Sequence, residues 1–235
     1  MYLEITQKSS IIVFMFRMRM MRRLNNLLFC LVFGTTVIAQ DPEFTQFYAS
    51  PLYLNPALAG ATVCPRVVLN YRNQWPNLSG QFVTYSASYD QFARSLKGGI
   101  GFLLLTDRAG EGTITNTQLS AVYAYQLDIT RKFSIKGGVQ ATFVQKRVDW
   151  TKLKFGDQID PRYGWVYETK EIPQAEMVFY PDFSAGFLAY SPNFYGGVAV
   201  NHLHEPNETF YSKSTNKSHL PRKYTVHAGG GNSIG

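Results

Sequence analysis

The sequence predicts an all-β fold: an antiparallel transmembrane outer-membrane β-barrel that is truncated at its C-terminus. Runs of alternating apolar and polar residues fill the chain after residue 40, and this alternation is typical of strands, whose successive side chains point to opposite faces. Short and long links alternate between these runs. In an up-and-down sheet every second link lies at the same end, so one end carries turns and the other carries loops, as in outer-membrane barrels.

Residues 1–39 are expected to be an over-extended start followed by a signal peptide. Arg22 and Arg23 supply the positive charge, Leu27–Val37 forms the apolar core, and Ala39 is the small residue before the cleavage site. A single N-terminal membrane anchor is the alternative, which the short apolar run disfavours. The sequence therefore predicts a protein that is exported to the cell outer membrane.

Composition argues against several other classes of protein. The formal net charge is +7, but much of it belongs to the predicted leader, so the remainder gives no case for nucleic-acid binding. Cys64 is the only cysteine after the leader, and an internal disulfide is therefore not possible. No run of about twenty apolar residues follows residue 40, so no helical span is expected there.

Residues 40–65 are expected to form an irregular N-terminal segment. They mix aromatic residues with Pro42, Pro51 and the Asn55-Pro56 pair, a composition that predicts a packed segment rather than a strand. A partial β-barrel over residues 66–235, of about seven to eight strands, completes the predicted domain organisation.

The predicted strands are joined by tight links at 93–97, 129–132 and 192–193 and by longer links elsewhere. Their ranges are Arg66–Asn73, Phe82–Phe92, Gly98–Asp107, Thr113–Asp128, Phe133–Trp150, Phe179–Ser191, Phe194–His204 and Pro221–Gly229.

Three details indicate that the apolar face of these strands contacts lipid and not the core of a soluble β-sandwich. The strands are long, and aromatic residues such as Phe82 and Phe133 lie near their ends, where the membrane interfaces would be. The polar face carries Asp90, Lys136 and Lys146, which a wet or hydrogen-bonded lumen tolerates better than a sandwich core does.

The predicted strands do not complete a barrel. Bacterial single-chain barrels normally have an even number of strands, yet the eighth strand here is only partly visible. The C-terminal residues Gly229–Gly235 do not form an amphipathic strand. Because an open sheet edge in lipid leaves backbone groups unpaired, we expect the chain to be a fragment of a longer barrel.

Several motifs in order along the chain resemble one known family. They are Asp41–Gly60, Cys64–Pro76, Thr84–Asp90, Gly98–Gly101, Asp107–Gly112, Leu153–Arg162 and His202–Asn207. Together they are similar to the PorP/SprF family of Bacteroidetes outer-membrane proteins, which is associated with type IX secretion and gliding motility. The resemblance covers roughly residues 40–229, and its specificity comes from the recurrence of several unrelated motifs in one order.

The resemblance implies a β-barrel accessory component of type IX protein secretion and gliding motility, which assists export or surface anchoring of secreted adhesins. The implied partners are other type IX secretion components, an exported adhesin and outer-membrane lipid, with no nucleic acid. The family offers no catalytic centre to carry over, so we expect neither an enzyme nor a cofactor or metal site.

Two alternative functions stay open. A passive outer-membrane pore or small-hydrophobe transporter would conduct in planar bilayers. A barrel-embedded lipid hydrolase would depend on His202 or His204 as a base, although no nucleophile motif accompanies them. These two histidines, two apart on a predicted strand, would share a face and could bind a metal, but no third ligand is evident.

Six residues are the candidates for partner contact: Tyr71, Arg72, Gln74, Trp75, Asp157 and Asp160. The first four could form a binding patch at a barrel rim, or simply end a strand with an interfacial Trp and Arg. The two aspartates could chelate calcium, but the loop lacks the other oxygen ligands that calcium needs. Pairing with nearby Arg162, which would staple the loop, is the favoured interpretation.

Overall fold

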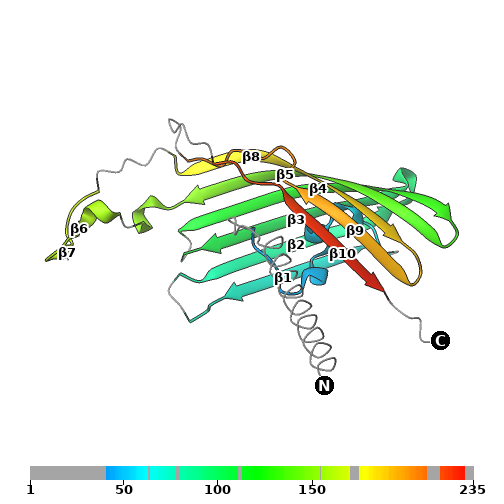
Figure 1. The fold of residues 1–235 in the computed structure, drawn as a ribbon, viewed down its shortest axis with the longest axis horizontal. Helices are drawn as coiled ribbons and strands as arrows, with labels where there is room; N and C mark the ends of the chain where they lie inside the picture. Colours follow the sequence, from blue (N-terminus) through cyan, green and yellow to red (C-terminus); the bar gives the residue numbers. More distant parts are fainter. Residues whose placement is uncertain are drawn as a thin grey trace, which may run out of the picture. The chain divides into compact units, whose positions relative to one another are not determined.

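Eight antiparallel strands form a single curled sheet (Figure 1). The computed structural model describes residues 41–62, 64–77, 80–110, 113–153, 155–169, 175–210 and 218–230, and the predicted leader at 1–39 lies outside them. Residues from Pro42 onward form a unit of their own. The strand order is β1-β2-β3-β4-β5-β8-β9-β10, so each strand pairs with its neighbours along the chain. The predicted antiparallel up-and-down sheet of an outer-membrane barrel is confirmed.

The strands of this sheet run from eight to seventeen residues. Their bounds are β1 Arg66–Gln74, β2 Phe82–Ala93, β3 Gly98–Ala109, β4 Ile114–Thr130, β5 Phe133–Val148, β8 Met177–Tyr190, β9 Phe194–Asn201 and β10 Lys223–Gly230. A tilted strand crosses a bilayer in about 9–11 residues. The longest strands, β4 and β5, therefore reach well beyond a membrane core.

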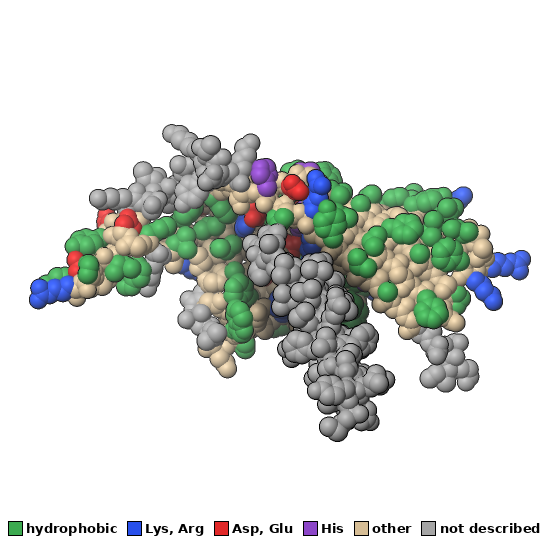
Figure 2. Space-filling model, in the orientation of Figure 1, with side chains coloured by type: hydrophobic (Ala, Val, Ile, Leu, Met, Phe, Trp, Pro, Cys, Tyr) green, Lys and Arg blue, Asp and Glu red, His purple; other side chains and the backbone are tan. Residues whose placement is uncertain are grey.

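One face of the sheet, called here the outer face, carries large apolar side chains on every strand. Leu69 on β1 and Val226 on β10 are 75% and 79% exposed. In between, Leu104, Leu119 and Phe143 share one cross-strand row on β3, β4 and β5. Hydrophobic side chains cover much of the visible sheet surface (Figure 2). An apolar surface of this extent matches the lipid-facing side of a barrel.

Two predicted strands end two or more residues earlier than expected. The range Phe194–His204 was too long, because β9 ends at Asn201 and the next residue, His202, has a positive φ of 56° that breaks the strand. The range Phe133–Trp150 was also too long, because the chain leaves β5 after Val148 and enters a 3-10 turn at Trp150.

The long loop between β5 and β8 contains structure that the alternation pattern does not reveal. It holds two 3-10 turns, η4 Trp150–Lys152 and η5 Gly156–Gln158, and a small hairpin of β6 Ile159–Asp160 and β7 Gly164–Trp165. The link between β2 and β3 contains one further 3-10 turn, η3 Arg94–Leu96.

Short helical turns occupy the segment before β1. They are η1 Phe47–Ala49, α2 Pro51–Leu54 and η2 Pro56–Leu58. Among the described residues, no helix is both long enough and apolar enough to cross a membrane.

Candidate functional site

The segment Phe44–Gly60, called here the inner segment, lies against the face of the sheet opposite the outer face. Pro51 and Pro56 each begin a helical turn, a position where proline costs no hydrogen bond. Asn55 caps η2, because its side-chain oxygen accepts from the backbone N–H of Ala57 at 2.8 Å. Local sequence therefore folds the segment into a compact double turn.

A row of small residues on the sheet receives this double turn. Five residues at paired positions on β3, β4, β5, β8 and β9 make up this small-residue row: Gly99, Ala124, Gly138, Gly186 and Ala199. A Cβ atom at any of its three glycines would overlap an atom of the inner segment, at distances that real Cβ atoms do not show. Glycine in these strands thus permits a close backbone approach, which explains its presence in strand interiors.

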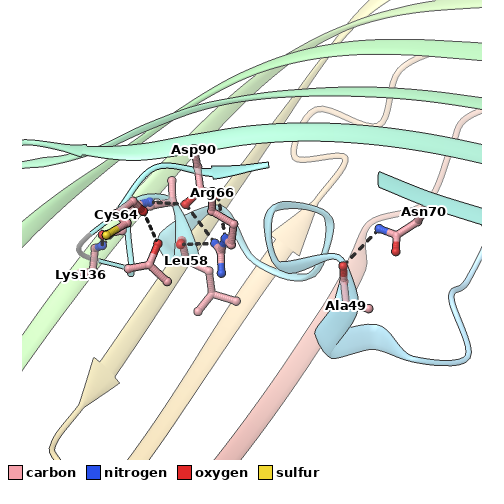
Figure 3. A network of polar contacts seen from close by, with 10 residues as sticks. Ala49, Leu58, Cys64, Arg66, Asn70, Asp90 and Lys136 are labelled. Carbon is pink, nitrogen blue, oxygen red and sulfur yellow. Dashed lines mark hydrogen bonds and ion pairs between the residues drawn. The ribbon is translucent and has the colours of Figure 1, made fainter. Parts of the chain in front are cut away.

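Charged residues fasten the C-terminal end of the inner segment to β1, β2 and β5 (Figure 3). The Asp90 carboxylate accepts from the backbone N–H of Gly60 at 2.8 Å and from Arg66 Nε and Nη2 at 2.9 and 3.0 Å. Lys136 Nζ donates to the carbonyls of Ala59 and Gly60 at 2.8 and 3.0 Å. Asp90 and Lys136 are each only 1% exposed. A buried charge is tolerated only when such partners surround it.

A second set of contacts fastens the other part of the inner segment to β8, β9 and β10. Asn55 Nδ2 lies 3.2 Å from the carbonyl oxygens of Phe187 and Val198 and 2.9 Å from His227 Nε2. Glu43, one residue before the segment, pairs with Lys223 on β10. The inner segment therefore contacts the first strands of the sheet, β1 and β2, and also the last, β9 and β10. Because it spans the sheet in this way, it is also called the brace below.

The brace changes the environment expected for the polar face. The sequence places Asp90 and Lys136 on that face, where a wet or a hydrogen-bonded lumen would suit them. The structure buries both of them under the inner segment, with hydrogen bonds in place of water. Chemically, the arrangement can hold a segment in a fixed position.

The four predicted contact residues on β1 and just after it divide between two environments. Tyr71 is on the outer face, where its ring lies 5.2 Å from that of Tyr85. Trp75 follows the strand with a positive φ of 56° and is 55% exposed. Arg72 and Gln74 bond to each other through their side chains and are half-buried. The interfacial aromatic character is present, and partner binding stays a prediction.

The two predicted aspartates lie in the β5–β8 loop, and no described contact joins them to the β1 residues. Asp160 Oδ1 accepts from the backbone N–H groups of Arg162 and Tyr163 at 2.7 and 2.9 Å, and Oδ2 accepts from the Tyr167 hydroxyl at 2.8 Å. These donors, led by Arg162 N–H, hold the pKa of Asp160 below its ordinary value of 3.8. Asp157 accepts from the Thr169 hydroxyl. The loop is stapled, but through the backbone of Arg162 rather than its guanidinium.

The expectation that His202 and His204 share a strand face is wrong, because β9 ends before them. His202 Nδ1 instead lies 2.8 Å from Asp182 Oδ2, both side chains being buried. His204 is 4.0 Å from the other oxygen of Asp182 and is partly exposed. Within the described ranges, no group of three or more His, Cys, Asp or Glu side chains is arranged to hold a metal ion.

Sequence reasoning missed the residues that hold the inner segment: Asn55, Arg66, Gly99, Gly138, Gly186 and His227. Two features of the sequence could have indicated these contacts. One is the glycine that β3, β5 and β8 each carry on the polar face. The other is the Asn55-Pro56 pair, which predicts a compact turn able to enter a narrow groove. Joining the two requires the strand register, which the alternation pattern alone does not supply.

The comparison with known families adds to this geometry. A model of the family described as type IX secretion system membrane protein PorP/SprF matches residues 36–234. The chain belongs to the PorP/SprF family. It is therefore related to membrane components of the type IX secretion system, as its sequence motifs imply. No curated protein and no solved structure matches the chain.

Proposed function

We propose that this chain is an outer-membrane β-barrel accessory of type IX secretion and gliding motility. In this role it assists the export or the surface anchoring of secreted adhesins, together with other type IX components. Membership of the PorP/SprF family carries the proposal. The mechanism is docking and scaffolding, without bond-making chemistry.

The inner segment covers the inner face of the sheet, and this supports a docking role over bulk transport through the lumen. A passive pore or small-hydrophobe transporter needs a continuous path along the lumen. Here buried residues of the inner segment, among them Leu52, Ala57 and Ala59, pack against the inner face of the sheet instead. The exposed ends of the strands and the long β5–β8 loop are the surfaces left for partners.

Deletion of the gene in the source cells tests the proposal. The expected result is loss of large adhesins from the cell surface, measured by labelling of intact cells, while other type IX cargo is still released. Restoration by the wild-type gene is the control. Normal adhesin display together with reduced uptake of small hydrophobic solutes would contradict the proposal and favour the transporter.

A further inference from the structure

Four cations lie in two of the three short turns at one end of the sheet. Arg94 and Lys97 belong to the β2–β3 link, and Arg131 and Lys132 belong to the β4–β5 turn. All four are exposed, and none forms an ion pair with a described residue. Lys and Arg side chains gather at the end of the molecule where the β4–β5 turn lies (Figure 2).

Elsewhere in the described sheet and loops, cations commonly have carboxylate partners. The pairs are Arg66–Asp90, Lys146–Glu208, Lys152–Asp149, Arg222–Glu205 and Lys223–Glu43. The acid closest in sequence to the β4–β5 turn, Asp128, is already engaged by the Ser134 hydroxyl and the Gln126 amide. Four cations against this one carboxylate leave the short-turn end with a net positive charge.

The apolar outer face continues right up to these cations. Ile129, next to the β4–β5 turn, is 54% exposed, and Phe133, directly after it, is 39% exposed. Leu96, between the two cations of the β2–β3 link, is 49% exposed. Lys and Arg side chains placed at such a border lie with their stems along apolar surface and their charges at headgroup depth.

We propose that Arg94, Lys97, Arg131 and Lys132 bind the anionic phospholipid headgroups of the leaflet at the short-turn end. Negative lipid surfaces attract basic residues that lie next to the hydrocarbon. An acidic protein is the less suitable occupant, because the apolar side chains between the cations would then meet water or protein instead of lipid. The inference concerns the membrane contact and does not depend on the role in secretion.

Titration of phosphatidylglycerol into the detergent-solubilised full chain, followed by native mass spectrometry, tests this inference. The test variant carries Arg94→Gln, Lys97→Gln, Arg131→Gln and Lys132→Gln. We expect it to bind phosphatidylglycerol at least about tenfold more weakly than the wild type, while binding of zwitterionic phosphatidylcholine is unchanged. A variant with Lys in place of both arginines and Arg in place of both lysines should retain the affinity.

A matched control removes four exposed cations from the opposite end of the sheet and its loops: Arg108→Gln, Arg147→Gln, Lys152→Gln and Arg162→Gln. This control variant should bind phosphatidylglycerol less than twofold more weakly than the wild type. Equal losses in the two variants would mean that net charge alone attracts the lipid and would overturn the proposal. So would a short-turn variant that binds phosphatidylglycerol normally but no longer retains an acidic protein partner. Should the fourfold variant fail to fold, Arg131→Gln with Lys132→Gln alone gives the same comparison.

Discussion

At the scale of single residues, Asp90 joins the brace to the first strands of the sheet. It accepts from Arg66 on β1 and from the backbone of Gly60, and Lys136 binds the adjacent carbonyls. Its position on the polar face of a strand follows from alternation alone. Its burial does not, because the inner segment that covers it lies thirty residues earlier in the chain.

Substitution of Asp90 should destabilise the sheet strongly. In Asp90→Ala, the Arg66 guanidinium and the Gly60 N–H lose their acceptor, and breaking a buried pair from one side costs about 3–5 kcal/mol. The temperature at which the folded, fast-migrating band disappears in semi-native electrophoresis measures this loss. Asp128→Ala, at an exposed position, is the control and should stay within about 0.5 kcal/mol of the wild type. Equal melting of the two variants would refute the role of Asp90.

Asp160 should make the β6–β7 hairpin sensitive to acid only at low pH. Its pKa is lowered, first by the Arg162 N–H and then by the Tyr167 hydroxyl. A lowered pKa stabilises the fold at every pH above the ordinary value, and the contribution disappears as the pH falls through the lower, folded value. We therefore expect constant Trp165 fluorescence down to about pH 4 and a change below it.

The measurement needs a protein in which Trp75 and Trp150 are replaced by Phe, so that Trp165 alone reports on the hairpin. Asp160→Ala in that background should give the loosened signal already at neutral pH and no further titration. A wild-type transition near neutral pH would show that another group controls the hairpin.

At the scale of elements, β5 provides a matched pair of glycines. Gly138 belongs to the small-residue row, and a side chain there would overlap the backbone of Ala57. Gly137, its neighbour, points to the outer face, where a Cβ atom would meet nothing within 4 Å. Two substitutions in the same strand thus differ only in the face that they reach.

Gly138→Val should displace the inner segment, whereas Gly137→Val should be tolerated. Overpacking against fixed backbone costs about 1–3 kcal/mol, and valine suits a strand at the open position. Limited proteolysis of the inner segment reads out the displacement, with faster cleavage expected for Gly138→Val alone. Equal protection of both variants would mean that the small-residue row does not hold the segment.

The elements that sequence predicted well are those decided by local pattern. The start of β2 at Phe82 and of β3 at Gly98 follow from alternation and from the links before them. The end of β9 does not, because His202 leaves the strand through a positive φ beside Asp182, on the neighbouring strand β8. The brace was missed for the same reason: Asn55 contacts residues more than 130 positions away.

At the scale of the whole molecule, the sheet and its apolar outer face give an electrophoretic prediction. Closed strand ladders in membrane barrels resist detergent at room temperature, so the folded protein migrates differently from the unfolded chain. We expect an immunoblot of the outer-membrane fraction to show a heat-dependent shift between unboiled and boiled samples. A soluble band without any shift would contradict the membrane barrel.

The brace also sets an order of events in time. Asn55 leaves the ribosome before any strand of the sheet, yet its partners on β8, β9 and β10 follow 132 to 172 residues later. The earliest residues of the folded unit are therefore among the last to be fixed. Until β4 forms, Leu52 lacks the surface of Val122 and Ala124 against which it packs, and the machinery that inserts the strands must protect this apolar peptide while the sheet grows.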